Sequence, residues 1–362
     1  MTASGYFSAD YFEARARFLA AAQAAGARLT RYDAPAAGPG GEALTTDTAW
    51  LGPRAAERVL VTISATHGAE GFCGSGVQLG WFASGLHREL PPGLALLAIH
   101  AINPYGFAWL RRVTEDNVDP NRNFIDHAAP YPVNAGYDAL HEALCPHEWN
   151  DAAIAEGRKV LGAYREAHGA WALQRAIAGG QYSHADGIFF GGHAYTWSHD
   201  TLLRILTTEL AEARHVAVID YHTGLGPRGY GERICVHLPD SDSLARAGQW
   251  YDEDITSPYF GSSTSTEIFG VNLIGMEAAL PQAQLTGIAL EYGTLPIEEV
   301  KLVLRADNWL HLHGELSSAK GRAIKDQVRE AFYQDADDWK DMVWERAVET
   351  QRLALRGLAE EG

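Results

Sequence analysis

Residues 58–71 read RVLVTISATHGAEG, and this stretch determines how the rest of the chain is interpreted. Its first half is an apolar, β-branched run, which is typical of a strand buried on both faces of a sheet. Its second half places His67 and Glu70 directly after that strand. Ligands of open α/β sheets bind at the carboxyl ends of the strands, so we expect these two side chains at a functional edge.

Further apolar runs indicate more buried strands, and amphipathic stretches between them indicate helices. These strands are expected at Leu94–Ile102, His215–Tyr221 and Thr286–Tyr292. Helices are expected at 8–28 with Ser8 as the N-cap, at 75–85 and at 201–213, and a Pro/Gly/Ala-rich loop at 35–41. Alternating strands and helices predict an α/β fold, with a mixed, mostly parallel twisted sheet and helices on both faces.

Two stretches fit this alternation less well, although neither has the composition of a linker. Residues 126–200 show no apolar strand, and we expect mostly helix from Asp138 to Ala178 followed by a loop. Residues 297–362 are helical by composition. We therefore expect a single domain over residues 1–362, with a helical and loop insertion at about 126–200 and a helical C-terminal tail at about 297–362.

The composition excludes several classes of function. The 362 residues contain 29 Lys and Arg against 46 Asp and Glu, a net charge of −17. Such a chain lacks the basic footprint that nucleic acids and anionic lipid surfaces require. No apolar run has the features of a membrane span or a secretory leader. Three cysteines without a CxxC pattern predict a reduced, cytoplasmic protein with no disulfide framework.

The residues that follow the strands suggest metal chemistry. His67, Glu70 and His222 form a set of two imidazoles and one carboxylate, which is a catalytic zinc set once a water completes it. On the residues alone a second interpretation stays open, in which His67 caps a turn and Glu70 opens a helix. Glu291 ends an apolar strand, where it is either a general base beside a metal or the partner of an arginine.

The segment from Arg111 to Phe124 is rich in Arg, Asn and Asp. Arginine binds carboxylates through two parallel hydrogen bonds, so a local arginine cluster in an acidic chain indicates an anionic group on the substrate. The alternative is that these arginines neutralise Glu115, Asp116 and Asp119 as surface pairs.

Taken in order, these motifs resemble those of a known family. They are His67-Gly-Ala-Glu70, Asn103-Pro-Tyr-Gly106, Arg112, Asp119-Pro-Asn121-Arg122-Asn123-Phe124, His222 and Glu291. The chain resembles the M14 zinc carboxypeptidase superfamily, in particular its bacterial members with a DUF2817-type domain. The resemblance spans residues 59–294, and the ordered set is much more specific than any single motif.

The resemblance implies a role for each residue. His67, Glu70 and His222 would hold one Zn2+, and Glu291 would be the general base that activates the metal-bound water. Arg112 would polarise the scissile carbonyl, with Arg111 as the alternative if the register is shifted by one residue. Asn121 and Arg122 would bind the carboxylate of the substrate.

The chain also departs from the secreted digestive members of that superfamily. The spacing from Glu70 to His222 is longer, and the extra residues fall in the stretch 126–200. Those enzymes use a tyrosine on a mobile loop, for which Tyr230 and Tyr259 are the candidates, with Tyr230 preferred. The aromatic loop at 187–198 resembles a segment of the same branch, and we expect it to line the cleft.

Three hypotheses follow. The leading one is a zinc-dependent hydrolase of an amide bond in a small molecule or short peptide with a free carboxylate. It includes a carboxypeptidase and an N-acyl-amino-acid deacylase similar to aspartoacylases and desuccinylases. The second is an inactive module that binds a carboxylate, and the third is an interaction scaffold built on the tail. The sequence leaves the oligomeric state open.

Overall fold

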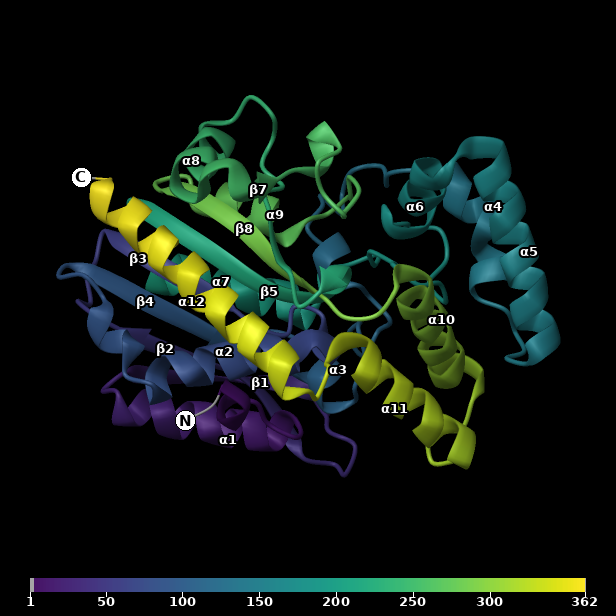
Figure 1. The fold of residues 1–362 in the computed structure, drawn as a ribbon, viewed down its shortest axis with the longest axis horizontal. Helices are drawn as coiled ribbons and strands as arrows, with labels where there is room; N and C mark the ends of the chain where they lie inside the picture. The colour runs from purple at the N-terminus through teal and green to yellow at the C-terminus, as the bar shows by residue number, and fades with distance from the viewer. Residues whose placement is uncertain (1–2, 362) are drawn as a thin grey trace.

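The computed structural model describes residues 3–361, which form one α/β domain around an eight-stranded sheet (Figure 1). The strands follow the spatial order β1-β2-β4-β3-β5-β8-β6-β7. Their bounds are β1 Arg28–Ala37, β2 Ala43–Leu51, β3 Arg58–Ile63, β4 Leu94–His100, β5 His215–Arg228, β6 Gly231–Ile234, β7 Ile255–Thr256 and β8 Gln284–Gly293.

The centre of the sheet is parallel and its flanks are largely antiparallel. Strands β4, β3, β5 and β8 pair in parallel, whereas β1 with β2, β2 with β4, and β6 with β8 pair antiparallel. The four parallel strands are the four apolar runs expected from the sequence, and β3 and β4 are buried almost throughout. The expected α/β fold class is confirmed.

The helices of the described residues cover both faces of this sheet (Figure 1). They are α1 Tyr11–Ala24, α2 Gly71–Ala83, α3 Pro104–Ala108, α4 Ala135–Leu144, α5 Asp151–His168, α6 Ala170–Ala178, α7 Trp197–Glu209, α8 Asp242–Tyr251, α9 Asn272–Ala279, α10 Ile297–His313, α11 Ala319–Phe332 and α12 Asp337–Glu360. Helices α1, α2, α8 and α12 pack on one face, and α7 and α9 pack on the other.

Side chains alternate between these two cores along each strand, as the pleat of a strand requires. In β3, Leu60 faces the α1, α2 and α12 side, whereas Val59 and Val61 face the α7 and α9 side. Helix α2 is buried on all sides, because the sheet lies on one side of it and α1 and α12 on the others. This packing fixes the turn that precedes α2, which carries His67 and Glu70.

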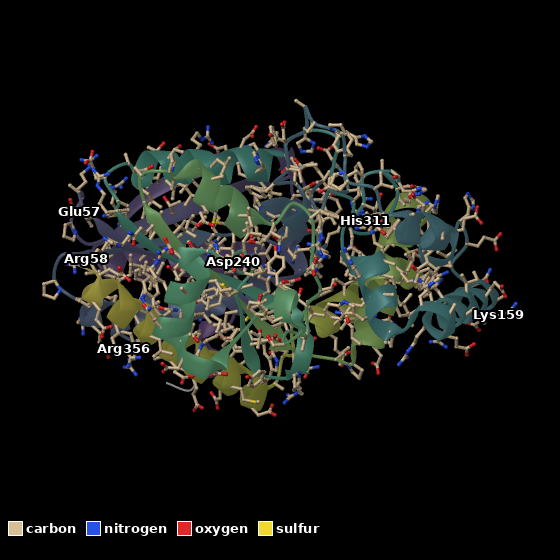
Figure 2. The ribbon with its side chains drawn as sticks, turned by 90° about the horizontal axis from the view of Figure 1, so that it is seen from above. Glu57, Arg58, Lys159, Asp240, His311 and Arg356 are labelled. Carbon is tan, nitrogen blue, oxygen red and sulfur yellow. The ribbon has the colours of Figure 1, made fainter. Side chains whose placement is uncertain are left out.

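A third core lies at one end of the sheet, where α4 and α6 pack near α10 and α11. Figure 2 shows this asymmetry, with Lys159 of α5 at one end of the molecule and Glu57 and Arg58 at the other. The helices expected between Asp138 and Ala178 are therefore present. Residues 297–360 are also largely helical, as their composition predicted.

Some local expectations are wrong. Residues 35–37 end strand β1 rather than belonging to a loop, because β1 is an edge strand and its register shifts between Asp33 and Ala37. Proline is tolerated in such a position, where no ladder hydrogen bond is lost. The N-cap of α1 is Asp10, whose side chain accepts a hydrogen bond from the Glu13 amide, and not Ser8.

Cys73, Cys145 and Cys235 are free thiols. Among the described residues, no helix combines the length and apolar character that a bilayer crossing needs.

Candidate metal centre

The candidate site lies where strands β3, β5 and β8 carry their polar residues. His67 follows β3, while His222 and Glu291 are directly paired across β5 and β8. Ala65 adopts a left-handed conformation with φ 58°, which turns the chain sharply after β3. Sequence-distant side chains thereby meet at one edge of the sheet, as the positions of the motifs predicted.

A glycine lets two of the motifs dock together. A Cβ atom at Gly68 would lie 2.0 Å from the carbonyl carbon of Gly106, so only glycine fits this close approach. The amides of Gly68 and Ala69 donate to the carbonyls of Arg112 and Arg111 at 3.1 and 2.9 Å. The turn that carries His67 is thus held directly against the arginine segment.

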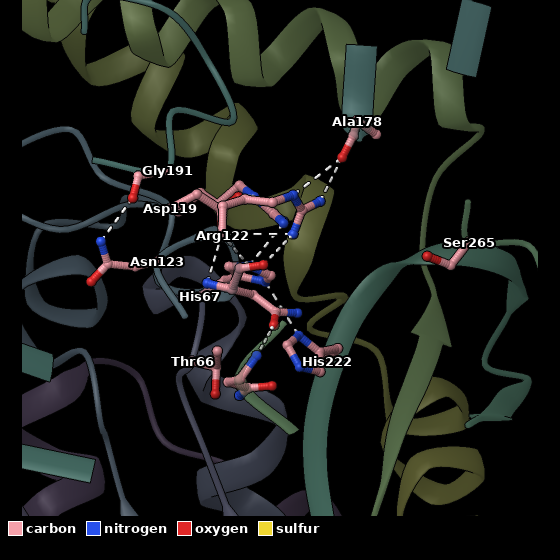
Figure 3. A network of polar contacts seen from close by, with 12 residues as sticks. Thr66, His67, Asp119, Arg122, Asn123, Ala178, Gly191, His222 and Ser265 are labelled. Carbon is pink, nitrogen blue, oxygen red and sulfur yellow. Dashed lines mark hydrogen bonds and ion pairs between the residues drawn. The ribbon is translucent and has the colours of Figure 1, made fainter. Parts of the chain in front are cut away.

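The three expected ligands converge at this edge of the sheet. Figure 3 shows two of them, His67 and His222, next to each other. The Nδ1 atoms of His67 and His222 lie 3.2 Å apart. The carboxylate of Glu70 places Oε1 3.0 Å from Nδ1 of His67 and Oε2 3.0 Å from Nδ1 of His222. All three side chains are buried, at 1–3% exposure. Two imidazole nitrogens and one carboxylate therefore face the same point.

Each imidazole is oriented by a second carboxylate. Nε2 of His67 lies 3.0 Å from Oδ1 of Asp119, and Nε2 of His222 lies 3.0 Å from Oδ2 of Asp220. Both aspartates are completely buried. A histidine ligand of a metal commonly gives its other ring N–H to a carboxylate, which fixes the tautomer and makes the ligand more basic.

This arrangement fits a metal ion. When each Nε2–H is donated to an aspartate, both Nδ1 atoms are left as lone-pair acceptors. Those two acceptors then face each other and the two oxygens of Glu70 at 3.0–3.2 Å. The oxygens of Glu70 accept from Arg112 and from the Thr223 amide, but the two facing Nδ1 atoms have no donor between them in this tautomer. A cation between them relieves the cost of burying both lone pairs. A set of two nitrogens and one carboxylate suits Zn2+.

Burial and neighbouring charges shift the pKa values of Glu70 and Glu291 in opposite directions. Burial disfavours the ionised form of Glu70, but His67 and His222 outweigh it and hold the pKa of Glu70 below its usual value. Burial and then the charge of Glu70 raise the pKa of Glu291 to about 8. The Leu225 amide donates to Oε1 of Glu291 at 3.0 Å, which orients this carboxylate beside the cluster.

Arg112 packs directly against the cluster. Its Nη1 donates to Oε1 of Glu70 at 2.9 Å, and its Nε donates to Oδ2 of Asp119 at 3.1 Å. The guanidinium stacks over the ring of Phe189, 5.2 Å from its centroid. These contacts place a fixed positive charge at the edge of the candidate metal centre.

Arg122 is held by backbone carbonyls. Its Nε and Nη2 donate to the carbonyl of Ala178 at 3.2 and 2.7 Å, and its Nη1 donates to the carbonyl of Asn121 at 2.7 Å. A guanidinium has five N–H donors, so one N–H on each terminal nitrogen is left over. The side chain of Asn121 accepts from the Asn272 amide at 2.9 Å, which links this segment to helix α9.

A cavity of about 100 Å³ joins these residues. Its polar lining includes the site residues His67, Arg112, Asn121, Arg122, His222 and Glu291, and further polar side chains come from Gln174, Thr223, Ser265, Thr266 and Lys301. Its apolar walls come from α6, β6, β8, α10, α11 and the 187–198 loop, through Ala178, Phe189, Ile234, Val236, Ile268, Ala289, Ile297, Val300, Leu304 and Phe332. Phe189 confirms the expectation that the 187–198 loop lines the cleft.

The remaining candidates lie elsewhere. Arg111 donates to the side chain of Asn117 and lies 3.9 Å from Asp307, in a separate small pocket with Arg112. The hydroxyl of Tyr230 donates to Asp254, and its ring packs under Arg346. Tyr259 lines a different hollow. These side chains are absent from the wall of the cavity that contains His67, as far as the described residues go.

Sequence reasoning did not assign roles to several residues of the site. Asp119 and Phe189 lay within motifs that had been noticed, but their contacts with His67 and Arg112 depend on loop conformations. The carbonyl of Ala178 carries no sequence signal at all, because a backbone group of any residue would serve. Asp220 precedes His222 by two positions on β5, so the two share a face of the strand, and the structure pairs their side chains.

Comparisons with known proteins give the class of the chain. A family described as "Protein of unknown function (DUF2817)" matches residues 7–346. The chain belongs to this family, which confirms the resemblance found in its motifs. No curated protein matches the chain significantly.

Several solved structures are similar at low sequence identity. Bovine thrombin-activatable fibrinolysis inhibitor, solved with a tick carboxypeptidase inhibitor, is 9% identical with a TM-score of 0.44, covering 95% of this chain and 98% of that one. A putative carboxypeptidase A from Shewanella denitrificans is 12% identical with a TM-score of 0.42, covering 96% and 71%. Murein-tripeptide amidase MpaA from Escherichia coli is 16% identical with a TM-score of 0.35, covering 82% and 91%.

Proposed function

We propose that this protein is a zinc-dependent hydrolase that cleaves an amide bond in a small substrate with a free carboxylate. One observation carries the proposal. Both imidazoles of the buried set of His67, Glu70 and His222 line a single cavity, together with the Glu291 carboxylate on the neighbouring strand and two fixed guanidinium groups.

His67, Glu70 and His222 hold the metal in this proposal. A zinc ion in such a site supplies a Lewis acid and lowers the pKa of a bound water to about 7. Asp119 and Asp220 keep the two imidazoles in the tautomer that binds the ion.

Glu291 accepts the proton of the attacking water and passes it to the leaving amine. Its position is fixed by the hydrogen bond from Leu225, and its pKa is raised toward the working range of a general base. Arg112 stabilises the negative charge that develops on the carbonyl oxygen, because its guanidinium is held in place before the reaction begins.

Arg122 and Asn121 bind the carboxylate of the substrate. The two N–H groups that Arg122 has left over belong to different terminal nitrogens, and this is the pair that a carboxylate accepts in a bidentate contact. The wall beyond them is apolar, through Ile234, Val236 and Ala289. The group next to the carboxylate is therefore a small apolar side chain.

A second candidate within the same chemistry is an N-acyl-amino-acid deacylase. The observation that favours it is the small volume of the cavity, whose lining includes Leu304 of α10, Phe332 of α11 and Phe189. A cavity of about 100 Å³ accommodates a short acyl group more readily than a long upstream peptide. The inactive binding module is disfavoured because Glu291 is present beside all three ligands.

The decisive test measures metal content and turnover together. We expect zinc in the purified wild type, which is lost in His67→Ala and in His222→Ala. A screen of dipeptides and N-acyl amino acids with apolar side chains should then detect hydrolysis, with Glu291→Gln as a metal-loaded inactive control. Folded wild-type protein that binds no zinc even after its addition would exclude the mechanism. Zinc binding with no turnover of any substrate would favour the inactive module.

A further inference from the structure

A second group of histidines and carboxylates lies outside the proposed active site. His141 of α4 meets His184 and Asp186 of the loop that follows α6, with one potential ligand atom from each within 4.8 Å of the others. The group shares no residue with the cavity that contains His67.

His141 lacks the hydrogen bonds that a largely buried imidazole needs. Its side chain is 14% exposed, and its Nδ1 atom is buried with no partner among the described residues. Its Nε2 atom lies 3.4 Å from Oδ1 of Asp186, which is longer than an ordinary N–H···O bond. That separation is about what two ligands show when both sit roughly 2.0–2.1 Å from a tetrahedral zinc.

His184 stands face to face with His141. The ring centroids lie 3.8 Å apart at 15°, so one ring has to turn about its side-chain bonds before both in-plane lone pairs reach one ion. Nε2 of His184 lies 3.0 Å from Oδ1 of Asp138, and this carboxylate fixes the orientation of the ring.

We propose that His141, His184 and Asp186 form a second binding site for a divalent transition-metal ion of the Zn2+ type. Two imidazoles and a carboxylate are the donors that such ions prefer, whereas Ca2+ and Mg2+ prefer oxygen alone. Nε2 of His141, which faces Asp186, is the atom that binds the ion. This inference does not depend on the proposed hydrolase activity.

The site joins a helix to a loop that reaches the active site. The Asn117 side chain donates to the carbonyls of Ala185 and Gly187, and the Asn308 side chain donates to the carbonyl of Asp186. Two residues beyond Gly187, Phe189 lies over the guanidinium groups of Arg112 and Arg122. An ion held by His141 and His184 therefore fixes the loop that carries this wall of the cavity.

The test counts metal in variants that lack one or both clusters. Purified proteins are equilibrated with Zn2+ and then freed of loosely bound ions, and the bound zinc per chain is measured. We expect two equivalents in the wild type, one in His67→Ala/His222→Ala, one in His141→Ala/His184→Ala and none in the fourfold variant. The variant His147→Ala/His313→Ala is a matched control, because it removes another contacting but exposed imidazole pair, with centroids 4.5 Å apart.

Two further variants protect the test against misfolding. Asp186 is 59% exposed, so Asp186→Asn should fold normally and weaken the second site about tenfold or more. His147→Ala/His313→Ala should keep both equivalents. A folded His67→Ala/His222→Ala protein without zinc would overturn the proposal, and so would zinc that persists in the fourfold variant. A failure of the hydrolase proposal alone would leave the zinc of the second site unchanged.

Discussion

The two histidine clusters of this protein use similar side chains but are held to very different degrees. His67, Glu70 and His222 are 1–3% exposed, and completely buried aspartates orient both imidazoles. In the second cluster, Asp186 is 59% exposed and Asp138 is 41% exposed. The first cluster is built on the ends of parallel strands and the second on a helix and a loop.

This difference has a consequence for function. Ligands on neighbouring strands of a packed sheet are fixed by backbone register, so their geometry persists whether or not an ion is bound. Ligands on a loop become ordered largely when the ion binds. The cost of this ordering reduces the net free energy of binding. The first cluster is therefore suited to catalysis and the second to holding a segment in place.

The largest expected contrast comes from removing one histidine from each cluster. His222→Ala should reduce kcat/KM by at least about 1,000-fold, because several kcal/mol of transition-state stabilisation depend on the ion. His141→Ala should change kcat/KM by less than about tenfold at saturating zinc, because it touches no reacting group and acts only through the loop that carries Phe189. Steady-state kinetics on the best substrate of the screen measure both. Equal losses in the two variants would contradict the assignment of catalysis to the first cluster.

The central strands could be predicted from the sequence, but the edges of the sheet could not. β3, β4, β5 and β8 are continuous apolar runs because helices cover both of their faces. β1 is half exposed and includes Arg28 and Pro35, so its composition is that of a loop. β7 has only two residues, which is too short for any periodic pattern.

The site residues, too, could be predicted where they follow buried strands and not where only packing brings them together. His67, Glu70, His222 and Glu291 were predicted because each follows or ends an apolar strand. The second cluster was not predicted, because its members converge only through the packing of α4 against the 183–187 loop. The sequence did contain a hint, since Asp138 and His141 are three residues apart and share one face of a helix.

The next largest effect concerns substrate binding within the first region. Arg122→Gln should raise KM about 10- to 100-fold with a smaller change in kcat, because one charge-assisted bidentate contact is lost. Zinc content should stay at the wild-type value, since Arg122 contacts none of the three ligands directly.

A substrate analogue sharpens this result. The amide of the same substrate has no negative charge, so wild type and Arg122→Gln should cleave it with similar KM. A loss of equal size on the acid and on its amide would show that Arg122 acts by shaping the cavity rather than by binding a carboxylate.

A smaller effect is expected on zinc affinity when the carboxylate that orients a histidine is removed from each cluster. Asp220→Asn should weaken zinc binding at the first site about 10- to 100-fold, because the Nε2 atom of His222 loses its anionic partner. Asp138→Asn should weaken the second site less, because Asp138 is partly solvated and water replaces much of its effect on His184. Competition with a chromophoric chelator measures both affinities. The opposite ranking would show that burial does not set the strength of these pairs.

The smallest effect is thermal, and it isolates the second region. In His67→Ala/His222→Ala the first site is absent, so added zinc acts on stability only through His141, His184 and Asp186. A ligand present at about 100 times its Kd stabilises the native state by about 2.7 kcal/mol, provided that the unfolded chain does not bind it. For a chain of this length that free energy corresponds to a rise of a few degrees in Tm. The rise should disappear when Asp186→Asn is added at the same zinc concentration, and Mg2+ should not produce it.

If zinc stabilises the loop rather than the whole domain, it should instead slow amide exchange at residues 183–189 and leave Tm unchanged. In that case the ion would act on a locally unfolding segment, which is the behaviour expected of a tether on a loop and not of a support for the core.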